Sequence, residues 1–228
     1  MKNINEICDT EFYGLNDMVK TGCGDCQGCC DCCTGMGESV ILNPYDIWHL
    51  EKNLDTSFEG LMAAGKIELN LVNGTILPNL KMTGEEERCA FLDREGRCSI
   101  HSFRPGICRI FPLGRDYGAD GIRYFLLPEG CRKDNKTKVK VRKWIDTEDV
   151  KRNEEFLICW HKFLKRIQGK IGESRDSERI KTLNMYILKS FFFMPYEGEK
   201  DFYIQFYERI EKTERDLGLE KEEIKDDK

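Results

Sequence analysis

Six cysteines lie within eleven residues near the start of this chain, and no other feature restricts its fold as strongly. Thiols this close together either oxidise to disulfides or bind metal as thiolates, since few other uses of cysteine need so many sulfur atoms in one place. The choice between these two chemistries largely decides what the protein is. The stretch reads Cys23-Gly-Asp-Cys26-Gln-Gly-Cys29-Cys30-Asp-Cys32-Cys33.

The size and the N-terminal sequence of the chain favour metal over disulfides. With 228 residues, the chain is long enough to bury a core without the covalent links that short secreted domains need. Residues 1–9 contain no apolar run of the kind that forms a signal peptide. We therefore expect a protein of the reducing cytoplasm, where clustered cysteines are metal ligands more often than disulfides.

Charge and hydropathy argue against two classes of partner. The formal net charge of −5 is unlike that of a general nucleic-acid binder, which has a basic balance. In a strand predicted over residues 136–144, basic residues alternate with valines, which indicates a sheet with one solvated face. The most apolar stretch, residues 185–196, contains Lys189 and is too short to span a bilayer. We expect neither nucleic acid nor a membrane as a partner.

The Cys-x2-Cys step repeats through the cysteine run. This spacing brings two sulfur atoms near one ion while backbone N–H groups hydrogen-bond to them. Two registers are open on spacing alone, one that ends at Cys30 and one that ends at the vicinal pair Cys32–Cys33. Adjacent side chains project in different directions, so the vicinal pair indicates two metal centres or a multinuclear one.

A second group of four cysteines follows the run. Residues 89–98 predict a tight hairpin with a cysteine at each open end and Gly96 in the turn, so this hairpin can offer two thiolates to one site. Neither group alone has enough thiols for two complete four-ligand metal sites, whereas the two groups together do. We therefore expect the two groups to lie close together. The four cysteines are Cys89, Cys98, Cys108 and Cys131.

Three other side chains are of residue types that can bind metal, two cysteines and one histidine. Cys8 and Cys159 are isolated in the sequence, and we interpret them as packing residues. His101 lies three residues after Cys98, so it remains open whether the two form a mixed pair of ligands.

The pattern of apolar residues changes along the chain and predicts an α+β fold. Residues 1–145 are expected to form a cysteine-rich metal-binding region of hairpins and short helices. Residues 146–228 are expected to form helices that pack on this region, with a frayed tail after residue 218.

Several local signals place elements in the first region. Residues 39–42 predict a short strand, and Asn43 predicts the N-cap of a helix that starts at Pro44. A second short helix is expected from residue 55 or 56. Asn73-Gly74 predicts the turn of a hairpin between two alternating strands.

The C-terminal region contains three stripes of apolar residues at helical spacing. The first predicted helix is capped by Asp146 or Thr147 and ends before a linker over residues 169–177. The second ends at Pro195, and a third is expected around residues 202–210.

These motifs resemble the CxxCxxCC cysteine-cluster family, the YkgJ-like proteins, over residues 20 to 135. Members of this family are regarded as zinc- or iron-chelating, so the resemblance implies metal binding without specifying a reaction. The resemblance rests on the Cys-x2-Cys-x2-Cys-Cys pattern, followed by a strand and a helix start, and on the segments Cys89-Ala-Phe-Leu, Cys98-Ser-Ile-His and Arg104-Pro105-Gly-Ile-Cys108-Arg109-Ile-Phe-Pro112.

Carried over from the family, the motif falls best on four cysteines of the run and on the four later ones. The distance to residues 42–46 fits the register that ends at Cys33 better than the other register. Cys23 and Cys30 are then additional thiols, and His101 stands where many relatives have an aromatic residue. The candidate metal ligands are Cys23, Cys26, Cys29, Cys32, Cys33, Cys89, Cys98, Cys108 and Cys131.

Three arginines, Arg104, Arg109 and Arg115, crowd around Cys108 in the sequence. They can lower thiol pKa values or bind an anionic substrate, or they can offset the charge of metal-bound thiolates, which is the interpretation that we favour. We treat Arg104 and Arg109 as candidate cofactor-binding residues and expect them to point toward the metal region. The sequence shows no phosphate loop, dinucleotide fingerprint or Ser/His/Asp arrangement.

The sequence thus predicts a metal-binding protein that holds zinc or an iron–sulfur cluster through clustered thiolates. Because both kinds of centre take the same ligands, spacing leaves the choice of metal open. The alternative is a metal-dependent or redox enzyme, in which an open position on the metal carries out chemistry. A third hypothesis is an adaptor that presents its C-terminal helices to a protein partner.

Overall fold

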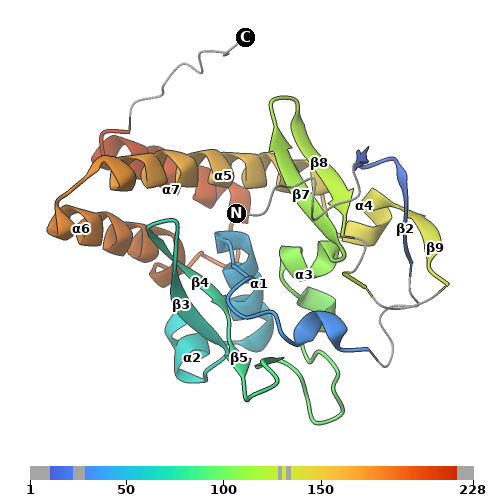
Figure 1. Ribbon diagram of the computed structural model, residues 1–228. Coiled ribbons are helices and arrows are strands. Elements are labelled where there is room, and N and C mark those ends of the chain that lie inside the picture. Colours follow the sequence, from blue (N-terminus) through green and yellow to red (C-terminus); the bar gives the residue numbers. More distant parts are fainter. Residues whose placement is uncertain (1–10, 23–28, 128–129, 132–134, 220–228) are drawn as a thin grey trace.

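The computed structural model describes residues 11–22, 29–127, 130–131 and 135–219, and it confirms the predicted α+β class (Figure 1). Short helices and small antiparallel sheets form the first part of the chain, and three long helices form the last part. Both parts contribute to one large hydrophobic core, with side chains from Val40 to Leu219. The long helices and Cys89 therefore belong to the same core.

The helix α1, Pro44–Leu54, begins as the sequence predicts. The side chain of Asn43 accepts a hydrogen bond from the backbone N–H of Asp46, and Asp46 accepts one from the N–H of Asn43, each 3.0 Å long. This capping box satisfies two N–H groups, one of them a donor that the first turn leaves without a partner in the helix. The apolar face of α1 is buried as far as Leu50, whereas Leu54 is exposed.

A β-hairpin follows the short helix α2, Phe58–Ala63. Its strands are β3, Ile67–Val72, and β4, Thr75–Leu80, and Asn73-Gly74 forms the predicted turn. Both turn residues have a positive φ, 49° and 83°, which asparagine and glycine adopt more readily than other residues. A Cβ atom on Gly74 would lie only 2.8 Å from Ile171, so the turn also needs a glycine to let a C-terminal helix approach.

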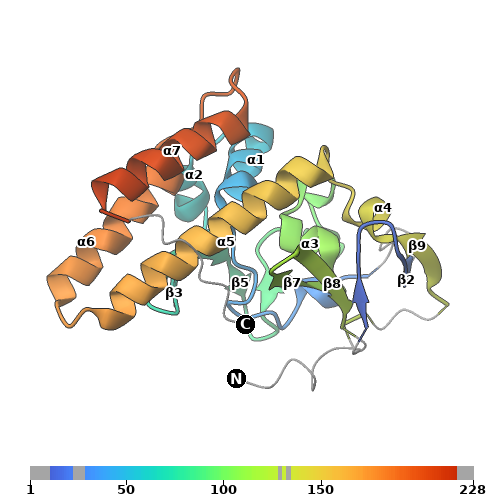
Figure 2. The same cartoon turned by 90° about the horizontal axis from the view of Figure 1, so that it is seen from above.

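Three long helices form the C-terminal part, and the first of them, α5, crosses the molecule (Figure 2). It contacts strand β4 of the first hairpin and strand β8 of a second hairpin. Fully buried aromatic rings fill the space between the helices: the Phe206 ring centroid lies 4.6 Å from that of Phe156 and 6.0 Å from that of Phe191. The helices are α5 (Val150–Glu173), α6 (Ser177–Leu188), continued by a π-helical turn over Lys189–Phe193, and α7 (Phe202–Asp216).

The opposite end of the molecule contains small antiparallel sheets around a second, smaller core (Figure 1). Strand β8 pairs with β7 and with β1, and β2 pairs with β9. The Tyr124 hydroxyl of β8 donates a 2.8 Å hydrogen bond to Glu154 of α5, which joins this end to the long helices. The elements are β1 (Phe12–Tyr13), β2 (Met18–Gly22), β7 (Leu113–Gly118), β8 (Gly121–Leu126), β9 (Thr137–Lys140) and α4 (Val141–Ile145).

Two predicted strands are shorter than the sequence suggests. The basic strand ends at Lys140, because Val141 turns into α4 and is fully buried in the smaller core. Residues 39–42 run along β4 and share backbone hydrogen bonds with it, but they form only one β-bridge, between Ile41 and Asn79. Local alternation of apolar residues thus indicated extended backbone without giving its length.

The predicted boundaries of α5 are also wrong. Its N-cap is Asp149 rather than Asp146 or Thr147, because Asp146 has the left-handed conformation that ends α4, with φ 47°. The linker expected over residues 169–177 shrinks to residues 174–176, since α5 continues through two glycines and buries Ile171. Residues 220–228, most of the tail predicted to fray, lie outside the described residues.

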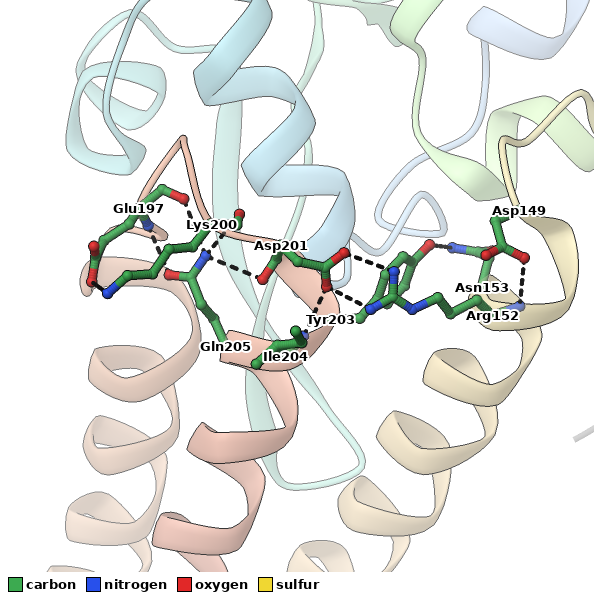
Figure 3. A network of polar contacts seen from close by, with 9 residues as sticks. All are labelled: Asp149, Arg152, Asn153, Glu197, Lys200, Asp201, Tyr203, Ile204 and Gln205. Carbon is green, nitrogen blue, oxygen red and sulfur yellow. Dashed lines mark hydrogen bonds and ion pairs between the residues drawn. The ribbon is translucent and has the colours of Figure 1, made fainter.

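A network of polar contacts joins the starts of α5 and α7 (Figure 3). The guanidinium of Arg152 donates two 2.7 Å hydrogen bonds to the two carboxylate oxygens of Asp201, and Asp201 also caps α7 by accepting the N–H of Ile204. Beside this pair, the Asn153 amide donates to the Tyr203 hydroxyl over 3.4 Å. The hydrogen bonds from Arg152 hold the pKa of Asp201 below its ordinary value of 3.8.

Replacing Asp201 by asparagine should therefore destabilise the fold slightly and in a pH-dependent way. Asparagine still caps the helix, so the loss is that of one half-exposed ion pair, about 0.5–1 kcal/mol at neutral pH. A carboxylate whose pKa is lower in the folded protein than in the unfolded chain stabilises the fold at pH values above its unfolded pKa. The difference in free energy of unfolding between wild type and variant should therefore decline as the pH falls through the lowered pKa. Urea unfolding of the wild type and the variant across this pH range measures the difference in stability. A difference that does not change with pH would contradict the role of the Arg152–Asp201 ion pair.

Candidate metal centre

Seven of the nine cysteines that the structure describes line a single cavity. This thiol cavity has a volume of about 80 Å³, and all nine cysteines are free thiols. Cys8, Cys23 and Cys26 lie outside the described residues. The cysteines in the wall come from both sequence groups, which the fold brings together: Cys29, Cys32, Cys33, Cys89, Cys98, Cys108 and Cys131.

A 3-10 turn, η2 (Asp31–Cys33), carries the first group to the cavity. The backbone N–H of Cys33 donates a 2.8 Å hydrogen bond to the carbonyl of Cys30, which closes the turn. The next residue, Thr34, forms a β-bridge with the first residue of β6, Arg88–Cys89. The turn and the first cysteine of the second group therefore lie side by side.

The segment from Cys89 to Cys98 is a tight turn rather than the regular hairpin that the sequence predicts. Strand β6 pairs instead with β5, Met82–Thr83, and Leu92 forms a single bridge with Cys98. The carboxylate of Asp93 accepts two backbone N–H groups of the turn, at 2.9 and 2.8 Å. Both cysteines still reach the thiol cavity, because the turn keeps the two ends of the segment close.

Cys108 is held in place by a buried carboxylate sixty residues earlier in the chain. It lies on the short helix α3, Gly106–Ile110, whose first N–H donates a 2.7 Å hydrogen bond to Asp46. Asp46 is 4% exposed and also belongs to the capping box of α1, so one side chain fixes the starts of two helices.

The carbonyl of Cys131 accepts a 2.6 Å hydrogen bond from Lys136.

Cys30 is oriented differently from the other cysteines of the run. It is not a lining residue of the thiol cavity, and its sulfur lies 3.9 Å from the position that a Cβ atom on Gly96 would take. Gly96 has φ 76°, a left-handed conformation that favours glycine. The vicinal pair Cys32–Cys33 therefore lines the cavity, whereas Cys30 lies beside the turn.

Burial makes several thiols of the cavity hard to ionise. It raises the pKa of Cys89, Cys98 and Cys108, and negative charge on Cys32 raises all three further. Thiolates gathered in such a place are stable only with positive charge among them, and a bound metal cation provides it and deprotonates its thiol ligands.

Cys32 differs because the side chain of the adjacent Cys33 hydrogen-bonds to its sulfur. The two sulfur atoms of the vicinal pair lie 3.9 Å apart, and the bond from Cys33 lowers the pKa of Cys32 to about 7. The positive charge of Arg104 lowers it further, against the opposing effect of burial. The same bond raises the pKa of Cys33, so Cys32 loses its proton before Cys33 does.

The donor set suits a thiophilic metal, although its geometry is not that of a closed site. Within the described ranges, no three cysteine, histidine or acidic side chains stand close enough together to hold an ion. Thiolate sulfur is nevertheless the ligand of structural zinc and of iron–sulfur clusters, and seven thiols share one wall. The agreement is therefore one of residue chemistry and of placement around one cavity.

The two predicted cofactor-binding arginines have different places. Arg104 lines the thiol cavity beside His101, and its guanidinium contacts the His101 ring. Arg109 is not a lining residue of that cavity; its guanidinium donates to the backbone carbonyls of Arg104, Ser102 and Asp146, at 3.1, 2.7 and 2.9 Å.

A second, more polar pocket lies next to the thiol cavity, and Arg104 belongs to the walls of both. We call it the arginine pocket, because Arg104, Arg109 and Arg115 line it together with Asp46 and His49. Its volume is about 220 Å³.

Sequence reasoning missed several residues of the site. Asp46 shows a signal for helix capping, but nothing in the sequence indicates that it also binds the start of α3. Arg97 and Trp144 line the thiol cavity, and Trp144 is placed there by hydrogen bonds to the carbonyls of residues 110 and 111. Its position depends on α4, which was predicted as strand.

Comparison with protein families identifies the part of the chain that contains every cysteine of the two groups except Cys23. Residues 25–148, more than half of the chain, match the model of the family described as "CxxCxxCC: Putative zinc- or iron-chelating domain". No curated protein and no solved structure matches the chain. None of the helices in the described ranges is long and apolar enough to cross a membrane.

Proposed function

Because this chain belongs to the CxxCxxCC family, we propose that it is a metal-binding protein that holds zinc or an iron–sulfur cluster through clustered thiolates. The observation that supports this function most strongly is the shared wall of the thiol cavity. Four separate stretches of the chain, residues 29–33, 89–98, 108 and 131, supply its cysteines. A buried cavity with so many thiols has little value as a hydrophobic core but suits a thiophilic metal.

The proposed ligands are the seven cysteines of the cavity wall together with Cys23 and Cys26. Zinc sites take four ligands, and iron–sulfur clusters of two or four irons also take four thiolates. Nine thiols are therefore enough for two centres or for one multinuclear centre. In either case the metal stabilises the fold, because it joins segments that are distant in sequence.

Arg104 is proposed to offset the surplus negative charge of the metal-bound thiolates. It lines the thiol cavity and lowers the pKa of Cys32, so its positive charge acts on at least one ligand. Cationic groups near a metal centre hold its ligands in their ionised state without binding the metal.

Anaerobic purification followed by elemental analysis and an absorption spectrum tests the function. A zinc protein should contain zinc in whole-number stoichiometry and have no visible absorption. An iron–sulfur protein should contain iron and acid-labile sulfide in similar amounts and absorb in the visible range. If the folded protein lacked stoichiometric metal after anaerobic purification, the proposal would be wrong.

A metal-dependent enzyme is the second candidate, and one observation favours it. Arg104 lies in the wall of both cavities, so a molecule in the arginine pocket would lie next to the thiols. The iron-containing or cobalt-substituted protein distinguishes the candidates, because the spectrum of a metal with an open position changes when a small anion is added, whereas a closed structural site does not respond.

A further inference from the structure

The arginine pocket gathers three positively charged side chains from separate parts of the fold. Arg104 follows the 3-10 turn η3 (His101–Phe103), Arg109 lies on α3 and Arg115 lies on β7, and the imidazole of His49 on α1 completes this side of the wall. Hydroxyl and amide groups complete the polar wall, which includes Ser102, Thr147, Asn43 and Asn153. The pocket has a volume of about 220 Å³.

The three guanidinium groups form no direct ion pair with a carboxylate among the residues that the structure describes, although the charges of Arg109 and Arg115 act on Asp46. Asp46 is the buried carboxylate of the pocket, and its two oxygens accept the backbone N–H groups of Asn43 and Gly106. Asp146 and Glu148 lie at the rim, where both are exposed. Because no described carboxylate pairs directly with these half-buried guanidinium groups, the pocket is suited to an anion from outside the chain.

The arginines also differ in how many of their donors are used. All three donor nitrogens of Arg109 are bound to backbone carbonyls, so its role is to hold the wall. The buried Nε atoms of Arg104 and Arg115 have no hydrogen-bond partner within the described ranges. Leaving a buried donor unpaired costs about 1–3 kcal/mol. An oxyanion in the pocket would supply acceptors to these arginines.

The protonation behaviour of the neighbouring groups agrees with a positive pocket. Burial lowers the pKa of His49 to about 4, and the charges of Arg109 and Lys52 lower it further. Burial also lowers the pKa of Arg109, with a second contribution from the charge of Arg104. His49 is therefore neutral at physiological pH and can donate one hydrogen bond to an anion.

We propose that the arginine pocket binds the oxyanion group of a small molecule, a phosphate or a carboxylate. Guanidinium groups pair with both kinds of oxyanion through two parallel hydrogen bonds, which an ammonium group cannot do. The site is separate from the proposed metal ligands, because the pocket contains no thiol and Arg109 and Arg115 do not line the thiol cavity. It therefore does not depend on the identity of the metal.

Calorimetric titration of the purified full-length protein with inorganic phosphate and, separately, with malonate tests the proposal at constant ionic strength. Saturable binding of at least one probe is expected, and Arg115→Gln should weaken it roughly 10- to 100-fold, because it removes charge-assisted hydrogen bonds. Binding of phosphate alone assigns a phosphate ligand, and binding of malonate alone assigns a carboxylate. No saturable binding of either probe would overturn the proposal.

Arg123→Gln is the matched control. Arg123 lies on β8, the strand that pairs with β7, and its guanidinium forms an exposed ion pair with Asp116 outside the pocket. This variant should bind the probes as the wild type does. Equal weakening by Arg123→Gln and Arg115→Gln would indicate a general effect of charge and would contradict a site in the pocket.

A measurement on the wild type covers the case in which Arg115→Gln does not fold. Negative charge next to His49 stabilises its imidazolium, so the probe that binds should raise the pKa of His49 in an NMR titration. The His49 signals are assigned by their loss in His49→Gln. An unchanged His49 pKa at saturating concentrations of the probe would place any bound anion elsewhere and would reject the proposal.

Discussion

Replacing Cys33 by serine is expected to release metal and to unfold much of the chain. Cys33 lines the thiol cavity and packs against the large hydrophobic core, so it belongs to both the proposed metal site and the interior. Where a metal joins distant segments, its binding energy contributes to the folding energy. The loss should reach about 4 kcal/mol or more, which is the range typical of mutations that remove a metal. Elemental analysis and urea unfolding measure the two effects.

Cys159→Ser is the control for this experiment. Cys159 lies on α5, away from the thiol cavity, and burial raises its pKa to about 11, so it remains a protonated packing residue at neutral pH. This variant should keep its full metal content, and we expect the same of Cys8→Ser. Similar metal loss in Cys33→Ser and Cys159→Ser would show that the cysteines of the cavity have no special role.

Phe206→Ala should destabilise the whole described fold, although Phe206 lies far from the cysteines in sequence. Its ring is fully buried and packs against four aromatic rings of α5, α7 and the π-helical turn. Truncating such a side chain leaves a cavity and typically costs about 3–5 kcal/mol. Because the large core includes Cys89, unfolding followed by circular dichroism and by thiol labelling should shift together.

Ile204→Ala is the matched control on the same helix. Ile204 is 57% exposed, so its truncation should change the free energy of unfolding by less than about 0.5 kcal/mol. If Phe206→Ala melted the helices while the cavity thiols stayed protected, the C-terminal helices would be a separate folding unit and the single-core description would be wrong.

Elements that rest on local chemistry could be predicted from the sequence. The capping residues at the start of α1 and the Asn73-Gly74 turn act within a few residues of themselves, and both occur as expected. The apolar stripe of α7, with Phe202, Phe206 and Ile210 buried, was equally readable from its spacing.

Elements that depend on distant partners were not predictable in the same way. Val141 fits a strand pattern, but it becomes the first residue of α4 because the smaller core buries it completely. Strands β7 and β8 were not foreseen, since only three-dimensional pairing distinguishes Leu113–Gly118 from a loop. The helix break at residue 146 likewise depends on a left-handed Asp146.

The candidate site shows the same division. Cysteine spacing was enough to predict that the two groups meet, because thiol chemistry permits few alternatives. The orientation of Cys30 away from the cavity could not be read from spacing, since both registers have the same intervals. The three arginines of the arginine pocket could be grouped from the sequence, whereas Asp46 and His49 could not be placed with them, because these two lie on a separate helix.

The wide spread of the cavity cysteines along the chain has a consequence for biosynthesis. The first described cysteine of the wall is residue 29 and the last is residue 131, so about 100 residues separate them. A ribosome that adds about 5–20 residues per second needs roughly 5–20 s to produce that interval. During this time the early thiols are exposed without their later partners. Yield of the loaded protein should therefore depend on the oxidant level and the metal supply at the ribosome.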